Sequence, residues 1–134
     1  MKLSSKSWYG VRLMTALASA GREQPLSLRQ AAQQLEISPK YLEQIVSALT
    51  KNGLLTGIRG TQGGYLLSEP PQSIRLGDII RATDGCILSA DCPQKDKERS
   101  ESLASDCGWR QFFHAVEAAA DSITLADMIK ERDK

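Results

Sequence analysis

The chain has 134 residues, with 17 Lys or Arg, 16 Asp or Glu and 41% hydrophobic residues. This length suits one domain with an appendage and argues against two full-sized domains, while the composition allows a packed core and argues against general disorder. No apolar run approaches the ~20 residues that cross a bilayer, and the first residues lack the apolar stretch of a signal peptide. We therefore expect a cytoplasmic protein with no membrane partner.

Charge is unevenly distributed along the chain. Residues 1–60 contain eight Lys or Arg and three Glu, a surplus of five positive charges, whereas residues 86–134 contain seven basic and ten acidic residues. This asymmetry favours a polyanion-binding surface in the first half of the chain, although five charges alone do not establish one.

The first two predicted elements are helices. Apolar residues recur at helical spacing over 4–20, and Gly21 supplies a natural C-terminal stop. A second, short helix begins at Ser27, because Ser27 and Gln30 have the spacing of a capping box.

A third helix is predicted to begin at Ser38, which is a good N-cap, with Pro39 at the first helical position, where its missing N–H costs no hydrogen bond. Asn52 and Gly53 end it. Apolar residues at i, i+3, i+4 and i+7 form the face expected to pack on the core: Leu42, Ile45, Val46 and Leu49. The opposite face is then free to contact a partner.

Two short apolar segments after Gly53 predict the strands of a hairpin. They span residues 54–58 and 64–67, and the glycine-rich stretch 59–63 joins them. A fourth helix follows over 76–83. Short helices, an amphipathic third helix and a hairpin are the order of a winged helix-turn-helix, so the expected fold class is mainly α with a small β-hairpin wing.

This arrangement predicts a surface that binds double-stranded DNA. Candidate DNA-binding residues at the start and on the free face of the third helix and at the hairpin tip are Ser38, Lys40, Tyr41, Glu43, Gln44, Arg59 and Gly60. Gln44 suits adenine, Glu43 can accept from a cytosine amine, and the residues at the helix N-terminus suit phosphates. Arg59 suits the negative potential of a narrow minor groove. The alternative for the helix face is a solvated polar surface, which the hairpin beside it disfavours.

The C-terminal half predicts a long loop and a long helix. Residues 84–106 show no periodicity, and loops of this length are commonly functional or disordered. From about Gly108 to Ser122 an apolar seam follows helical spacing: Trp109, Phe112, Val116, Ala120 and Ile123. Two bulky aromatics with little else to cover them favour a partner helix over packing inside one chain. Thr124 is expected to cap a short terminal helix.

Several motifs resemble the bacterial winged-helix transcription regulators of the IscR/NsrR/CymR family, over nearly the whole chain. They are residues 2–6 with Tyr9, 38–45, 53–54, 58–60, 63–67 and 77–80. The resemblance implies a homodimeric regulator, most simply a repressor, that binds an inverted-repeat operator. It also implies that Glu43 and Gln44 face the bases and that Arg59-Gly60 enters the minor groove. The sequence shows no nucleophile–base pair, so we expect no enzyme.

The same resemblance implies three regions. They are a winged helix-turn-helix DNA-binding domain at 1–83, a cysteine-containing sensor loop at 84–106, and a dimerisation helix with a short terminal helix at 107–134. In this division the long C-terminal helix forms the dimer, and two reading heads then face an inverted repeat.

Cys86, Cys92 and Cys107 are candidate metal ligands, because thiolates bind iron–sulfur clusters and zinc. The spacing of the first two is similar to that of the cluster-binding members, which implies an iron–sulfur cluster, with 2Fe–2S ahead of 4Fe–4S. Fourteen residues separate Cys92 from Cys107, more than in those members. A longer loop can still return the thiolate, since each doubling of loop length costs about 0.6 kcal/mol.

The fourth ligand is left open by the sequence. His114, the one histidine, lies seven residues beyond Cys107, and Trp8 stands where the nitric-oxide sensor of the family has a carboxylate. The remaining candidates are Asp84, Asp91, Asp106, Ser5, water and the second subunit.

Two alternative functions do not involve regulation through an iron–sulfur cluster. In the first, the chain is a metal-free DNA-binding regulator of cysteine or sulfur metabolism, controlled by a cysteine-synthesis enzyme or by thiol oxidation. In the second, it is a small iron–sulfur or thiol-redox protein whose helix-turn-helix mediates only interaction.

Overall fold

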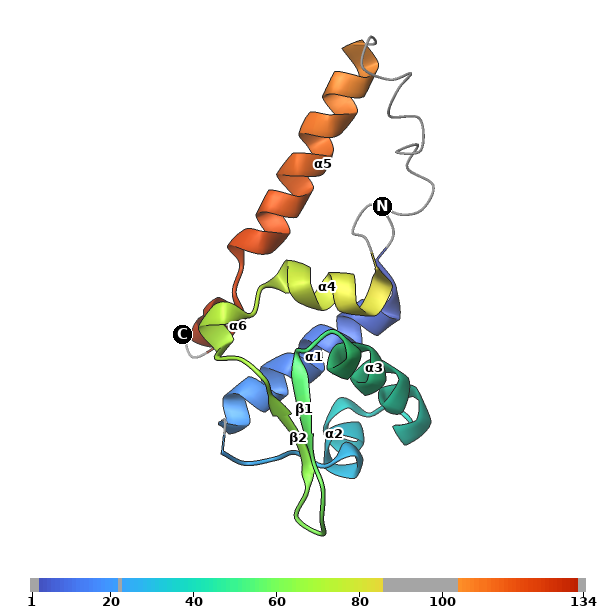
Figure 1. The fold of residues 1–134 in the computed structure, drawn as a ribbon, viewed down its shortest axis with the longest axis vertical. Helices are drawn as coiled ribbons and strands as arrows, with labels where there is room; N and C mark the ends of the chain where they lie inside the picture. Colours follow the sequence, from blue (N-terminus) through green and yellow to red (C-terminus); the bar gives the residue numbers. More distant parts are fainter. Residues whose placement is uncertain (1–2, 22, 86–103, 133–134) are drawn as a thin grey trace.

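The computed structural model describes residues 3–21, 23–85 and 104–132 (Figure 1). The elements in chain order are α1 (Ser5–Ala20), α2 (Leu28–Leu35), α3 (Pro39–Lys51), β1 (Leu55–Ile58), β2 (Gly64–Leu67), the 3-10 helix η1 (Pro71–Ser73), α4 (Leu76–Asp84), α5 (Ala104–Ser122) and α6 (Leu125–Arg132). A mainly helical chain with one antiparallel hairpin confirms the predicted fold class. No helix in these described ranges combines the length and the apolar character needed to cross a membrane.

Capping residues explain where α2 and α3 begin. The Ser27 hydroxyl accepts from the Gln30 amide and the Gln30 side chain accepts from the Ser27 amide, both at 3.2 Å, which confirms the predicted capping box. The Ser38 hydroxyl accepts from the Tyr41 amide at 3.1 Å, with Pro39 at the first helical position. Both sequence signals therefore fix the start of the helix that they precede.

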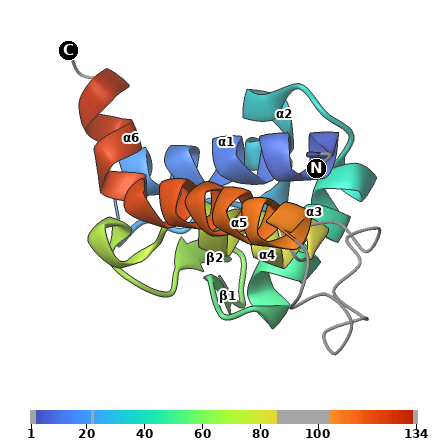
Figure 2. The ribbon, with the colours of Figure 1, turned by 90° about the horizontal axis from the view of Figure 1, so that it is seen from above.

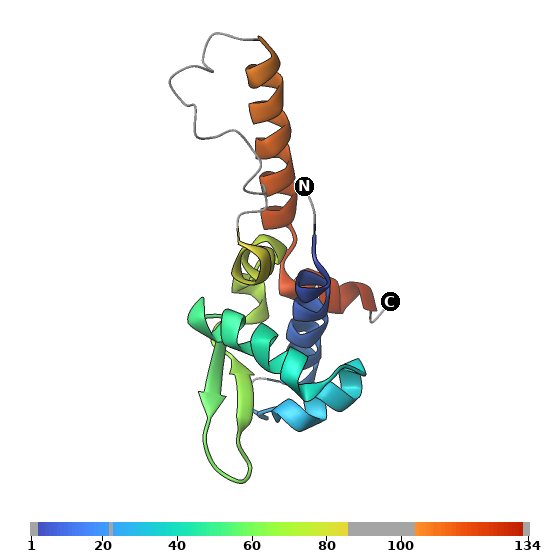
Figure 3. The same cartoon turned by 90° about the vertical axis from the view of Figure 1, so that its right-hand side faces the viewer.

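The two strands form the predicted wing. They pair antiparallel, with Leu55 opposite Leu67 and Ile58 opposite Gly64. The leucine pair is buried, whereas the far end of the hairpin projects into solvent (Figure 3). Tyr65 and Leu26 exchange backbone hydrogen bonds of 2.9 and 3.1 Å, so the segment before α2 lies against β2 and fixes the wing to the helical body.

The core lies where α1, α3, α4 and α6 meet the base of the hairpin. Its fully buried large side chains are Leu13, Met14, Leu42, Ile45, Leu49, Ile74, Ile79 and Leu125. At about 1.5–3 kcal/mol for each buried aliphatic side chain, these contacts are the main force that orients α3.

α5 extends away from this body, and α6 returns to pack beside α1 (Figures 1 and 2). The base of α5 is held by α4 in two ways: Val116 and Ala120 pack with Ile80, and Arg81 Nη2 lies 2.5 Å from Asp121 Oδ1. The hydrogen bond to Asp121, opposed by partial burial, raises the pKa of Arg81 above its already high ordinary value, so this guanidinium stays charged. An apolar contact and a charged pair therefore both hold the base of α5 on α4.

The predicted bounds of the C-terminal helix need correction. α5 begins at Ala104, four residues before the expected start at Gly108, and α4 extends to Asp84. Residues 104–107 read Ala-Ser-Asp-Cys, which contains no apolar periodicity, so the sequence pattern gave no sign of this first turn. The apolar seam also divides: Ala120 is buried against α4, whereas Trp109 is 58% and Phe112 48% exposed.

Candidate nucleic-acid interface

The apolar stripe of α3 fixes which way this helix faces. Leu42, Ile45 and Leu49 are 0% exposed and Val46 is 3% exposed, as the i, i+3, i+4, i+7 spacing predicts. The side chains on the other side are exposed to solvent: Ser38, Lys40, Glu43, Gln44, Ser47 and Lys51. The carboxylate of Glu43 and the amide of Gln44 are thus adjacent on one accessible face, where hydrogen-bonding groups suit base edges.

Tyr41 differs from the other predicted residues of α3 because it is half-buried. Its ring meets Tyr9 of α1 edge-on, with 6.0 Å between centroids and 89° between planes. Its hydroxyl lies 2.9 Å from the hydroxyl of Ser5. Tyr41 therefore joins the start of α3 to the start of α1, and its contact with a phosphate stays a prediction.

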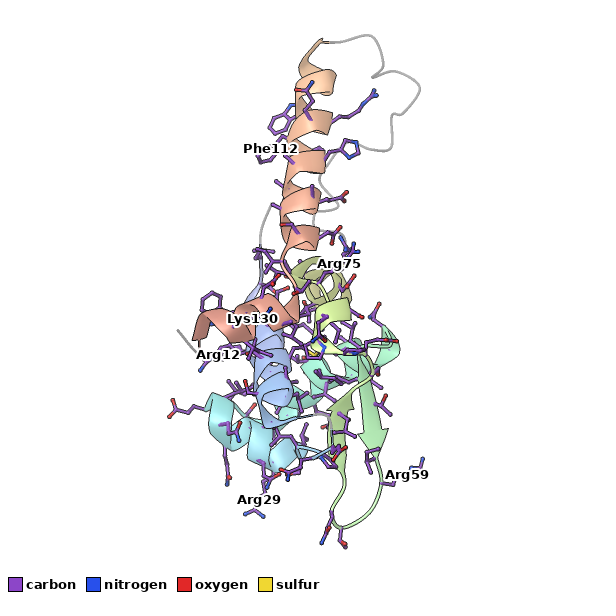
Figure 4. The ribbon with its side chains drawn as sticks, turned by 90° about the vertical axis from the view of Figure 1, so that its left-hand side faces the viewer. Arg12, Arg29, Arg59, Arg75, Phe112 and Lys130 are labelled. Atoms are coloured by element: carbon purple, nitrogen blue, oxygen red, sulfur yellow. The ribbon has the colours of Figure 1, made fainter. Side chains whose placement is uncertain are left out.

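The wing tip places Arg59 and Gly60 in solvent, at the end of the molecule opposite Phe112 (Figure 4). Gly60 has φ of +116°, a conformation that L side chains rarely adopt, and its carbonyl accepts from Gly63 N–H at 3.1 Å. Glycine is therefore required to turn the chain at this position. Arg59 is the basic side chain of this exposed turn.

Arg29 is an exposed cation that the sequence analysis did not single out. It lies in the first turn of α2 and projects from the same end of the molecule as Arg59 (Figure 4). The signal was present in the sequence, since a basic residue directly after a capped helix N-terminus is a common phosphate contact. With Lys40 and Arg59 it is one of three exposed basic side chains that come from α2, α3 and the wing.

The predicted metal ligands are not tested by this structure. Cys86 and Cys92 lie outside the described residues, and of Cys107 only the helical backbone in α5 is described. Within the described ranges no group of three or more His, Cys, Asp or Glu side chains is placed to hold a metal ion. The thiolates of these three cysteines would bind the metal, and their positions are not described, so the metal site stays a prediction from the sequence.

Two candidates for a fourth ligand are engaged in hydrogen bonds. Asp84 accepts from the Ser4 amide at 3.0 Å, from the Ser7 hydroxyl at 2.6 Å and from the Ser4 hydroxyl. Burial alone would raise the pKa of Asp84, but the hydrogen bonds from Ser4 and Ser7 and the charge of Lys6 hold it below its ordinary value. Ser5 is bonded to Tyr41.

His114 and Trp8, the two other residues considered for the fourth ligand position, are both exposed to solvent. His114 is exposed on α5, and Trp8 is 68% exposed on α1. The pairing of Asp84 with the serines of α1 had no signal in the sequence, because nearly 80 residues separate the partners.

Comparison with known proteins agrees with this geometry. The family model Rrf2, described as an iron-dependent transcriptional regulator, matches residues 3–131. The HTH-type transcriptional regulator CymR of Bacillus subtilis (strain 168) is 38% identical over 133 residues, covering 99% of this chain and 93% of the relative. IscR of Serratia proteamaculans (strain 568) is 33% identical over 134 residues, covering 99% and 82%.

Solved structures show the same fold. The structure of T. potens IscR has a TM-score of 0.78 and 37% identity, covering 98% of this chain and 88% of that chain. The structure of CymR, the global cysteine regulator of B. subtilis, has a TM-score of 0.78 and 36% identity, covering 98% of both chains. These relatives are transcription regulators and not enzymes, as the sequence predicts. The chain belongs to the Rrf2 family of winged-helix transcription regulators.

Proposed function

We propose that this regulator acts in the cytoplasm as a homodimeric repressor that binds an inverted-repeat operator and receives its signal through Cys86, Cys92 and Cys107. One observation carries the DNA-binding part: the apolar stripe of α3 is buried, so Glu43 and Gln44 are exposed on the same body as the wing. A helix anchored in this way can enter a major groove about 12 Å wide without unfolding its core.

Each exposed residue has a role set by its chemistry. Gln44 reads adenine through its amide, which pairs with N6 and N7, and Glu43 accepts from the cytosine amine. Ser38 and Lys40, at the N-terminus of α3, hold phosphates where unpaired backbone N–H groups already favour an anion. Arg59 enters the adjacent minor groove while Gly60 keeps the wing tip narrow.

The α5 helix supports the dimer. Trp109, Phe112 and Phe113 form an aromatic cluster, with centroids 5.8 to 6.2 Å apart, and Trp109 and Phe112 remain largely exposed. Such a face is costly to leave in water, and a second copy of α5 covers it with the same residues. A two-fold dimer then presents two copies of α3 and of the wing to the two half-sites of an inverted repeat.

The three cysteines suit the sensing role by their chemistry. Thiolates are the ligands of iron–sulfur clusters, and a 2Fe–2S cluster bound by Cys86, Cys92 and Cys107 would supply reversible redox chemistry to the regulator. Because Asp84 and Ser5 are hydrogen-bonded within the protomer, the fourth ligand is sought among Asp91, Asp106, water and the second subunit.

A metal-free sensor is the second candidate function. The observation that favours it is the similarity to CymR of B. subtilis, at 38% identity over 133 residues, since that relative is named as a cysteine regulator. In this version the signal reaches the same DNA-binding surface through a cysteine-synthesis enzyme or through oxidation of a thiol, and no cluster is needed.

The DNA-binding proposal is tested by selecting duplexes from a randomised pool with the wild-type protein. We expect enrichment of an inverted repeat whose half-sites are centred about one or more helical turns apart. Binding should weaken steeply with salt, because phosphate contacts release counterions. A selection that enriches no symmetric sequence, or an affinity that does not change with salt, contradicts the proposal.

The sensor proposal is tested by anaerobic purification with analysis of iron and acid-labile sulfide. We expect visible absorption from the wild type and its loss in each of the variants Cys86→Ala, Cys92→Ala and Cys107→Ala. Full absorption in Cys107→Ala would remove that residue from the ligand set. A colourless, iron-free protein from iron-replete cells would favour the metal-free candidate and leave the DNA-binding proposal intact.

A further inference from the structure

A polar network joins the first turn of α1 to the last turn of α4. Ser4 is the residue before α1, yet its hydroxyl makes no cap bond to its own helix and instead donates to the carboxylate of Asp84. The amide of Ser4 donates to the same carboxylate, so Asp84 takes the place of a cap for α1. A carboxylate at a helix N-terminus is also favoured by the helix dipole.

Ser7 makes the second half of this network. It is 2% exposed, donates to Asp84 at 2.6 Å and lies 2.6 Å from the hydroxyl of Thr83, which is 8% exposed. Ser7 and Thr83 each have one hydroxyl proton, so while Ser7 donates to Asp84 the Thr83 hydroxyl donates either to Ser7 or to the Ile79 carbonyl, which is 2.9 Å away. Among the described residues no buried side-chain N or O lacks a partner, so the network is satisfied as it stands.

The same turn of α1 also holds the start of α3. Ser5 lies between the two residues that contact Asp84, and its hydroxyl is 2.9 Å from the Tyr41 hydroxyl. Tyr9, one turn further along α1, packs against the Tyr41 ring. Tyr41 is itself the residue whose amide donates to the N-cap Ser38. The end of α4 and the start of α3 are therefore linked through one helical turn.

Close packing keeps this link stiff. A Cβ at Gly10 would lie 3.0 Å from Cγ2 of Thr83, so α1 and α4 approach too closely for a larger residue to sit between them without a shift. Because the two helices touch along this line, a movement at the end of α4 cannot be absorbed by a gap.

We propose that Asp84 is a positioning residue for the DNA-reading helix: it holds Ser4 and Ser7, and through Ser5 and Tyr41 it sets the N-terminal turn of α3. Asp84 is the last residue of α4 and lies beside the start of α1, and it is not among the residues of the proposed DNA surface. Its effect on DNA rests on the proposed function, whereas its effect on Tyr41 does not. Cys86 follows it by two residues in the sequence, so the link begins where the proposed sensor begins.

The first experiment measures Tyr41 without DNA. The full chain is labelled with 3-fluorotyrosine, and its three tyrosine signals in ¹⁹F NMR are assigned by replacing each tyrosine with Phe. We expect the Tyr41 signal to move in Asp84→Ala and in Ser5→Ala, and to stay unchanged in Ser19→Ala, a control at the exposed far end of α1. The Tyr65 signal serves as the internal reference, because Tyr65 lies in the wing.

A purely structural role for Asp84 would lower the melting temperature and leave the Tyr41 signal of the folded protein in place, and that result overturns the proposal. Asp84→Asn distinguishes the two roles further. Its amide keeps the shape of the carboxylate but replaces one of the two oxygens that accept from Ser4 and Ser7 with an N–H donor. If Asp84→Ala does not fold, Ser4→Ala removes one bond to Asp84 at an exposed position, and the same movement of the Tyr41 signal is expected.

The second experiment measures affinity for duplexes selected by the wild type. We expect about a tenfold loss in Asp84→Ala, and a loss below about twofold when Asp84→Ala is made in a Tyr41→Phe background, because the hydroxyl contact between Ser5 and Tyr41 is already absent there. Equal losses in both backgrounds would overturn the proposal. If the wild type selects no DNA, the proposed function fails, and the NMR result still decides whether Asp84 positions Tyr41.

Discussion

α3 and α5 are both amphipathic helices, but they differ in how much of the apolar face is buried. α3 buries its whole stripe in its own protomer, with Leu42, Ile45 and Leu49 at 0% exposure. α5 buries only its lower part against α4 and leaves Trp109 and Phe112 in solvent at the end far from the wing (Figure 4). The apolar face of α3 is therefore covered within the chain, whereas α5 keeps two exposed aromatic side chains.

This difference separates two tasks. A helix that reads DNA must have a fixed orientation before it binds, and full burial of one face provides this. A helix that assembles two copies must keep apolar surface available until they meet. The following variants test whether the two helices differ in this way.

The largest effect is expected from Leu42→Ala. Removing a side chain that is 0% exposed leaves a cavity under α3, and we expect the free energy of unfolding to fall by about 2–5 kcal/mol. Urea unfolding followed by circular dichroism measures the change. Lys40→Ala, on the exposed face of the same helix, should stay within about 0.5 kcal/mol. Equal losses in the two variants would show that α3 is not anchored as described.

The next effect is expected from Phe112→Glu. A charge in the aromatic face should raise the dissociation constant of the dimer by about 100-fold, or about 2.7 kcal/mol, because the carboxylate must leave water. Sedimentation velocity over a range of protein concentrations measures this shift. Gln111→Glu adds the same charge to the neighbouring exposed position and is the matched control. A dimer that survives both substitutions unchanged is held by another surface.

A smaller effect is expected at the reading surface. Arg59→Ala should weaken binding to selected duplexes by about tenfold and reduce the salt dependence by about one counterion, with little change in stability. Gln44→Ala should weaken binding similarly but relax the preference for one base pair. Lys130→Ala, on α6, removes one positive charge away from this surface and should bind as the wild type does (Figure 4). Wild-type affinity in the first two variants would remove both residues from the interface.

The smallest effect concerns α6. Hydrogen bonds from the Thr124 amide and hydroxyl hold the pKa of Asp127 below its ordinary value. The folded chain then binds fewer protons here than the unfolded chain does, so this stabilisation is present above pH about 4 and is lost as pH falls through the folded pKa. Asp127→Asn should narrow the stability difference between pH 7 and pH 3. A difference as large as that of the wild type would contradict this.

Sequence patterns predicted α2, α3 and the wing well because the signals for these elements are local. The capping box at Ser27, the Ser38-Pro39 start and the spacing of the leucines in α3 all act within two helical turns, and the structure confirms each. The wing was also predictable, because the two strand segments and the glycines that join them lie within 14 consecutive residues, 54–67. Thr124 caps α6 as expected, accepting from the Asp127 amide at 3.1 Å.

Long-range contacts were not predictable from the sequence. The bonds from Ser4 and Ser7 to Asp84 join residues nearly 80 positions apart, and nothing in the local pattern pairs them. The spacing of the apolar residues on α5 predicts one continuous face, but the position of α4 divides it, which spacing alone does not show. Whether the three cysteines bind one metal site depends on how the chain between Cys86 and Cys107 folds back to bring their thiolates together. The sequence does not give that path.

A photocrosslinking measurement tests the central claim most directly. The amino acid p-benzoyl-L-phenylalanine is placed at Lys40 on α3 in one sample and at Phe112 on α5 in another, and each is irradiated with a selected duplex. We expect a protein–DNA adduct from position 40 and an adduct of two protein chains from position 112. DNA crosslinked from position 112, with none from position 40, would contradict the assignment of the two helices.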